Sequence, residues 1–144
     1  MKAFVVLAVN IVLVSMLFCP MAMAAPPMPN DVQMVEADPS LPKELAGFCG
    51  KWEGHDGYQT WFLIVEKIDE EKAGLYLWRS GTPNSPGGWS RFPANVGKQY
   101  GKYSIWFPSK HPVYPGNIEF ALKGNNLDCD LPPPGGSFRL KRVP

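Results

Sequence analysis

The sequence predicts an all-β protein, folded as a small up-and-down antiparallel barrel of about eight short strands. Three observations favour this fold class. Short runs of aliphatic and aromatic residues follow one another from residue 46 to residue 143. Glycine and proline, with 14 and 16 residues, separate those runs into strands joined by turns. No stretch longer than a single turn has the period of an amphipathic helix. An open two-sheet β-sandwich is the alternative architecture.

Residues 1–24 have the pattern of a secretory signal peptide that is removed after residue 24. Lys2 supplies the positive start, an apolar run continues to Phe18, and Ala22-Met23-Ala24 is a small-x-small cleavage motif. The apolar run is too short to remain as a membrane anchor. Cys19 raises lipid attachment as an alternative, but the residue before it is bulkier than a lipoprotein signal needs. We therefore expect an exported protein, periplasmic or extracellular, without stable membrane insertion.

The mature chain divides into a tether, residues 25–44, and a barrel domain, residues 45–144. The tether is Pro-rich and mixed polar, which is typical of a flexible segment. Ser40 is placed to cap a single helical turn that ends near Leu45. Eight strands are then expected, over residues 46–53, 58–68, 73–79, 89–96, 103–107, 117–122, 127–131 and 137–143.

The turns and the alternation of side chains support these strands. His55-Asp56-Gly57 and Gly124-Asn125-Asn126 are sharp turn sequences, and residues 80–88 form a long Pro- and Gly-rich loop. Apolar and polar residues alternate cleanly in the sixth and eighth strands. In Trp61-Phe62-Leu63-Ile64-Val65 both faces are apolar, so we expect that strand to be covered on both sides.

The charge balance excludes some classes of partner. The chain carries 14 basic and 13 acidic residues, and removal of Lys2 with the leader leaves 13 of each. No stretch concentrates lysine and arginine, so neither nucleic acid nor an anionic membrane surface is expected as a partner.

Cys49 and Cys129 remain after processing. Export to an oxidising compartment would make a disulfide between them natural. Strand phase argues the other way, because Cys129 should point inward whereas Cys49 is out of phase with the inward Trp52. A disulfide and two separate thiols both stay open, and in the second case the inward thiol acts as a small hydrophobic side chain.

The segment Gly50-Lys51-Trp52-Glu53-Gly54 resembles the first strand of the calycin group, which includes lipocalins, fatty-acid-binding proteins and avidins. In lipocalins the tryptophan of such a Gly-x-Trp motif closes the bottom of the barrel, and a late arginine packs across its face. The resemblance implies these roles for Trp52 and for Arg142, which is in phase with the inward Leu140. Arg139 is the second choice. Such a stack contributes on the order of 1 kcal/mol.

Over residues 45–143 the chain looks more closely like a poorly characterised module of secreted bacterial proteins, which has no established activity. Four pieces in order carry this resemblance: Gly50-Lys51-Trp52-Glu53-Gly54, Val65-Glu66-Lys67-Ile68, Tyr76-Leu77-Trp78 and Gly88-Trp89-Ser90-Arg91. The barrel region, about 100 residues long, is shorter than a typical lipocalin, so its own side chains can fill it. Neither the biotin-binding residues of avidins nor a late-strand haem-binding histidine can be assigned, and we expect no cofactor.

Candidate catalytic residues are few. His55 and Asp56, close to Glu53, resemble a general acid–base site, but we interpret them as a polar turn between two strands. His111 lies far from His55 in the sequence, and the two lack the spacing of a zinc site. No serine elbow or phosphate-binding loop is present. We expect no catalytic residues, no metal and no enzyme activity.

Two functional hypotheses follow. In the first, a small, partly apolar ligand binds at a barrel mouth lined by Trp78, Trp89 and Arg91. In the second, the core is filled, and residues 25–39 contact a partner protein, as in small periplasmic protease inhibitors. Carbohydrate binding through Trp89 and Tyr114 is a third hypothesis. We expect a monomer in each case.

Overall fold

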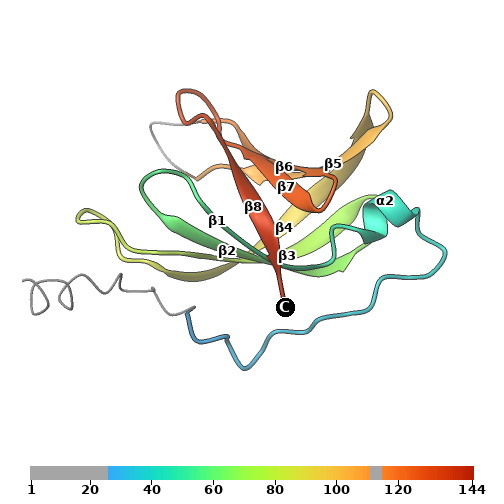
Figure 1. Ribbon diagram of the computed structural model, residues 1–144, viewed down its shortest axis with the longest axis horizontal. Coiled ribbons are helices and arrows are strands. Elements are labelled where there is room, and N and C mark those ends of the chain that lie inside the picture. Colours follow the sequence, from blue (N-terminus) through green and yellow to red (C-terminus); the bar gives the residue numbers. More distant parts are fainter. Residues whose placement is uncertain (1–25, 111–114) are drawn as a thin grey trace, which may run out of the picture.

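The computed structural model describes residues 26–110 and 115–144, which form one short helix and eight strands. The strands are antiparallel and follow one another in sequence order, and the last strand pairs with the first (Figure 1). The predicted closed barrel is therefore confirmed, and the open β-sandwich is excluded. The leader and its expected cleavage site lie outside the described residues.

The observed strands agree with the predicted ones in number and order. The largest differences are the start of β1, which was expected at residue 46, and the longer course of β4. The elements are α2 (Lys43–Ala46), β1 (Gly50–His55), β2 (Thr60–Ile68), β3 (Lys72–Arg79), β4 (Gly88–Gln99), β5 (Lys102–Pro108), β6 (Asn117–Lys123), β7 (Asn126–Asp130) and β8 (Ser137–Val143).

The helical turn lies slightly later than predicted, and Ser40 does not cap it. Pro42 is the N-cap residue of α2, and no side chain bonds to the free amides there. Ser40 instead donates from both its hydroxyl and its amide to Oδ1 of Asp38, at 2.7 and 2.8 Å. The turn continues past the helix, because the amides of Phe48 and Cys49 donate to carbonyls within it. Residues 46–49 are therefore unavailable to the first strand.

Inward-facing side chains fill the barrel. Phe92 stacks on Phe107 with ring centroids 4.5 Å apart, and Phe107 meets Phe120 at 6.2 Å. Cys129 is fully buried, which confirms its predicted inward orientation. The largest fully buried side chains are those of Trp52, Phe48, Phe120, Leu45, Leu63, Ile64, Leu75, Ile105, Leu127, Leu140, Val65 and Cys129.

The N-terminal segment, residues 26–42, runs along the outside of the barrel beneath β2 and β3, before the chain enters α2 (Figure 1). The amide of Val35 donates to the carbonyl of Glu66 on β2 at 2.8 Å. Ile64 belongs to the outward phase of β2 and is nevertheless only 2% exposed. The prediction that this strand is covered on both sides is confirmed at Ile64 and Val65, which are both buried.

Candidate functional site

Trp52 and Arg142 close the end of the barrel that carries α2, here called the helix end. The two residues are paired across β1 and β8, and the Arg142 guanidinium lies 4.1 Å from the centroid of the indole ring. The guanidinium also donates to the carbonyls of Cys49 and Gly47 at 2.7 and 2.6 Å. Arg142 therefore has the expected position. Arg139 lies outside and pairs with Asp128 instead, at 2.8 Å.

Gly50 is required by this arrangement. Its φ of 132° lies in a region that side-chain-bearing residues rarely adopt. A Cβ atom at this position would also collide with Nη1 of Arg142. The Gly-x-Trp motif is thus explained by the close approach of an arginine to the backbone at the helix end.

Trp78, Trp89 and Arg91 come together on the outside of the barrel, and of the three Trp89 alone also borders a hollow at the end opposite α2. Trp78 pairs with Trp89 across β3 and β4, and the next outward pair is Tyr76 with Arg91. The intervening Leu77 is buried in the core. Since side chains of a strand alternate between its two faces, the three predicted residues lie on the outside of the barrel. Their expected placement at the mouth was therefore wrong for Trp78 and Arg91, whereas Trp89 borders that hollow.

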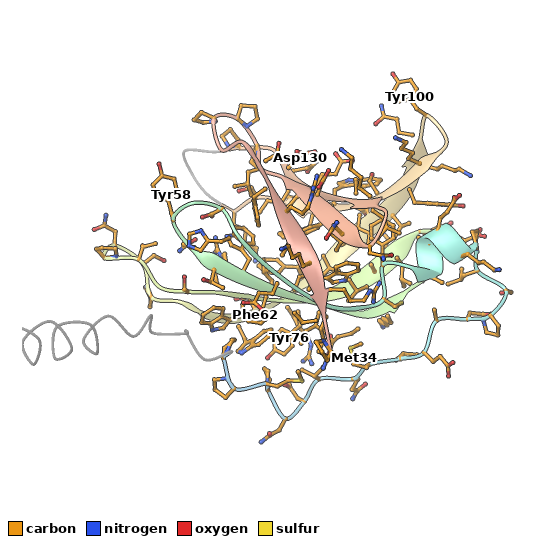
Figure 2. The ribbon with its side chains drawn as sticks, viewed as in Figure 1. Met34, Tyr58, Phe62, Tyr76, Tyr100 and Asp130 are labelled. Carbon is orange, nitrogen blue, oxygen red and sulfur yellow. The ribbon has the colours of Figure 1, made fainter. Side chains whose placement is uncertain are left out.

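Phe62 and Tyr76 extend this group across three strands. We call Phe62, Tyr76, Trp78, Trp89 and Arg91 together the outer aromatic face. The Phe62 and Trp78 rings lie 5.8 Å apart, and the Tyr76 and Trp89 rings 5.1 Å apart. The Arg91 guanidinium lies 4.6 Å from the centroid of Tyr76. Figure 2 shows Phe62 and Tyr76 on the side of the sheet where the N-terminal segment carries Met34.

Two carboxylates that the sequence analysis missed hold Arg91. Glu66 accepts two hydrogen bonds from the guanidinium, at 3.0 and 3.1 Å, and Asp31 accepts a third at 2.8 Å. The hydrogen bonds from Arg91 hold the pKa of Glu66 below its ordinary value, and both carboxylates raise the pKa of Arg91. The Glu66 side chain is only 11% exposed, whereas that of Asp31 is 59% exposed. The presence of Glu66 within a largely apolar strand is the sequence signal that could have indicated its ion pair with Arg91.

The N-terminal segment is held against the outer aromatic face at further points. The Trp89 indole donates to the carbonyl of Pro27 at 3.1 Å, and the Gln33 amide donates to Oε1 of Glu66 at 3.0 Å. A groove of about 650 Å³ remains between the segment and the sheet. Its floor includes Gly74 and Pro93, which pair across β3 and β4 and place no long side chain there.

The opposite end of the barrel, here called the loop end, is closed by side chains. Trp61 packs against Phe138 at 5.1 Å, and its indole donates to Oδ2 of Asp56 at 2.8 Å. A hollow of about 140 Å³ at this end is lined by Leu77, Phe92, Trp89 and part of the loop that precedes β4.

His55 and Asp56 form the polar turn that the sequence favours. Nδ1 of His55 accepts a hydrogen bond from Gly57, and Oδ1 of Asp56 accepts two from the amides of Tyr58 and Gln59. Within residues 26–110 and 115–144, no three His, Cys, Asp or Glu side chains are close enough together to hold a metal ion. Tyr114, considered above for sugar binding, lies outside the described residues.

Cys49 and Cys129 are both free thiols, at opposite ends of the barrel. Cys129 pairs with Phe138, whereas Trp52 pairs with Arg142, four residues further along β8. Four residues of extended strand span about 13 Å, and Cys49 lies still further toward the helix end. A disulfide needs Cα atoms within about 7 Å, so this fold keeps the two thiols apart.

Comparison of the chain with family models, curated proteins and solved structures gave no match. The closed eight-stranded antiparallel barrel itself agrees with a calycin-like fold. Among the described residues, no helix has the length and apolar character needed to cross a membrane.

Proposed function

We propose that this chain is an exported, non-enzymatic binding module of the calycin-like secreted bacterial type, which engages a partner protein on the outside of its barrel. The observation that carries the proposal is the outer aromatic face: four aromatic rings and an arginine gathered on the exterior of three adjacent strands. Tyrosine, tryptophan and arginine dominate the energetic centres of protein interfaces.

The packed interior supports binding on the outside. Eleven large side chains within the barrel and at its helix end are less than 2% exposed. The hollow at the loop end, about 140 Å³, is below the range of roughly 300–1,000 Å³ that is usual for small-molecule sites. A non-enzymatic role is supported by the use of the titratable side chains, because Asp56 shapes a turn and Glu66 holds Arg91.

A small, partly apolar ligand in the groove is the second candidate. Its volume of about 650 Å³ lies within the range for small-molecule sites, and Arg91 lines it. Native mass spectrometry of the protein from its own exported fraction, before and after denaturing extraction, distinguishes the two candidates. An added mass that denaturing extraction releases supports the small-ligand candidate. A mass equal to that of the protein alone excludes this candidate.

Partner capture from the exported fraction tests the first candidate. The mature chain serves as bait in three forms: wild type, Trp78→Ser and Tyr58→Ser. Trp78 belongs to the outer aromatic face, whereas Tyr58 is 90% exposed in the turn between β1 and β2 and projects away from that face (Figure 2). We expect capture of the same protein to fall at least about tenfold with Trp78→Ser, as for an interface hot spot, and to stay unchanged with Tyr58→Ser.

The fold of each variant is checked by its urea midpoint, and Trp89→Ser provides an independent change on the same face. If the captured protein is retained equally by wild type, Trp78→Ser and Trp89→Ser, the proposal is wrong.

A further inference from the structure

The N-terminal segment contacts the barrel on both sides of a turn at residues 29–32, in which the Val32 amide donates to the carbonyl of Pro29. Residues 27, 31, 33 and 35 each make at least one hydrogen bond to β2 or β4. After the turn, residues 31, 33 and 35 alternate as in an extended chain, so these three positions share one edge of the segment, and residue 27 makes its contact before the turn. The segment therefore lies on the outer aromatic face in an orderly register.

Most of these contacts use the backbone of the segment. The carbonyls of Pro27 and Asp31 accept from Trp89 and Arg91, at 3.1 and 2.7 Å. The amides of residues 33 and 35 donate to the side chain and the carbonyl of Glu66, at 3.0 and 2.8 Å. Among these contacts, the side chain of the segment takes part only through the carboxylate of Asp31, which accepts a hydrogen bond from Arg91. Any extended peptide with a suitably placed carboxylate can offer this set of groups.

The barrel side of the contact is preorganised for such a peptide. Arg91 is fixed by Tyr76 on one face and by two hydrogen bonds to Glu66. Lys67, Lys72 and Asp69 also line the groove, so Arg91 is one of several charged groups there. The ion pair between Asp31 and Arg91 joins two side chains that are 59% and 46% exposed. Ion pairs at such exposure contribute at most about 1 kcal/mol.

We propose that the outer aromatic face is a docking site for an extended, carboxylate-bearing segment of a partner protein, and that residues 27–35 are its displaceable resident. The inference rests on the function proposed above and adds the chemistry of the partner. A partner must then displace the resident segment, so its apparent affinity is lowered by the fraction of molecules in which the face is covered.

A fluorescent synthetic peptide of residues 26–36 is the probe, and its binding to the mature full chain is followed by anisotropy. One variant, Asp31→Ala with Gln33→Pro, removes a carboxylate and an amide donor from the resident segment and leaves the barrel unchanged. We expect it to bind the peptide at least about tenfold more tightly than wild type does. Adding Arg91→Ala to this variant should abolish binding, whereas adding Tyr58→Ser should not change it.

A peptide that itself carries Asp31→Ala should bind the opened variant far more weakly. Equal affinity of wild type and the opened variant, or binding that survives Arg91→Ala, would overturn the inference. A concentration-dependent dimer with exchanged segments in native mass spectrometry would also overturn it, in favour of a second copy as the occupant. If the peptide experiment fails but partner capture still depends on Trp78, this inference is wrong and the proposed function is retained.

Discussion

Two arginines stabilise opposite parts of this molecule by the same combination of contacts. Arg142 stacks on Trp52 and donates to two backbone carbonyls at the helix end. Arg91 stacks on Tyr76 and donates to two carboxylates and one carbonyl. The planar guanidinium, with five donors, can serve a ring and several oxygens at once, which a lysine cannot do.

Arg142→Ala should lower the free energy of unfolding by about 1–3 kcal/mol, because it removes a cation–π contact and two hydrogen bonds to carbonyls. Arg142→Lys should recover only part of this loss, since the ammonium lacks the forked geometry. Urea denaturation followed by far-ultraviolet circular dichroism measures the difference. Arg139→Ala is the matched control, and we expect a change below about 1 kcal/mol because its ion pair with Asp128 is exposed. A larger loss with Arg139→Ala would contradict this account of the helix end.

Among the elements, β2 and the N-terminal segment depend on each other. The pairing of β2 with β3 shifts register between Val65 and Lys67, which marks a β-bulge around Glu66. Glu66 keeps the outward phase of Phe62 and Ile64 and lies beside Arg91, and the bulge leaves it without a paired residue on β3. The glutamate then offers its side chain and its carbonyl to amides of the segment. Docking of the N-terminal segment therefore depends on the ionised carboxylate of Glu66.

The docked segment should be released by acid. Hydrogen bonds from Arg91 lower the pKa of Glu66 from the ordinary 4.5, so the ionised form stabilises docking above pH 4.5. That stabilisation is lost as the pH falls through the lowered pKa of the folded state. The indole N–H signal of Trp89, which reports the contact with Pro27, should shift during a nuclear magnetic resonance titration.

The indole N–H of Trp52 is an internal control in this titration, because it donates to the carbonyl of Phe48 inside the barrel and should not move. In the Glu66→Gln variant, the Trp89 indole N–H signal should lie at every pH where the wild-type signal lies at low pH. A Trp89 signal that stays constant until Trp52 also shifts would refute the link between Glu66 and docking.

At the scale of the whole molecule, the closed barrel separates the two cysteines that the sequence left as a possible pair. Burial raises the pKa of the Cys129 thiol strongly, and it raises that of the half-buried Cys49 thiol to a lesser degree. Both effects disfavour the reactive thiolate. Their positions at opposite ends of the barrel prevent a bond between them without unfolding.

The native mature protein should therefore have the mass of the dithiol, about 2 Da above that of a disulfide. Iodoacetamide at pH 8 should modify Cys49 slowly and leave Cys129 unmodified until urea unfolds the barrel. Peptide mapping by mass spectrometry locates the label. Equal labelling rates for the two thiols in the native protein, or a mass 2 Da lower, would contradict the observed topology.

The sequence by itself determined the strands and the helix end. Turn residues such as Gly124 and Asn125 and the alternation of Ile118 and Phe120 with polar neighbours are local signals, so they could be recognised without a structure. The role of Arg142 was implied by the resemblance to lipocalins, and its phase in β8 selected it over Arg139. The outward orientation of Trp78 was readable in the same way, since Leu75 and Leu77 alternate with it.

Only the tertiary structure decided where the outer aromatic face lies and what covers it. Trp78 and Trp89 meet through the register of β3 with β4, and Glu66 of β2 meets Arg91 of β4 across the intervening strand. Asp31 joins them from 60 residues away along the chain. Contacts over such separations depend on strand pairing and on barrel closure. Both bring together residues that lie far apart in the sequence, so the local pattern around each residue does not indicate its partner.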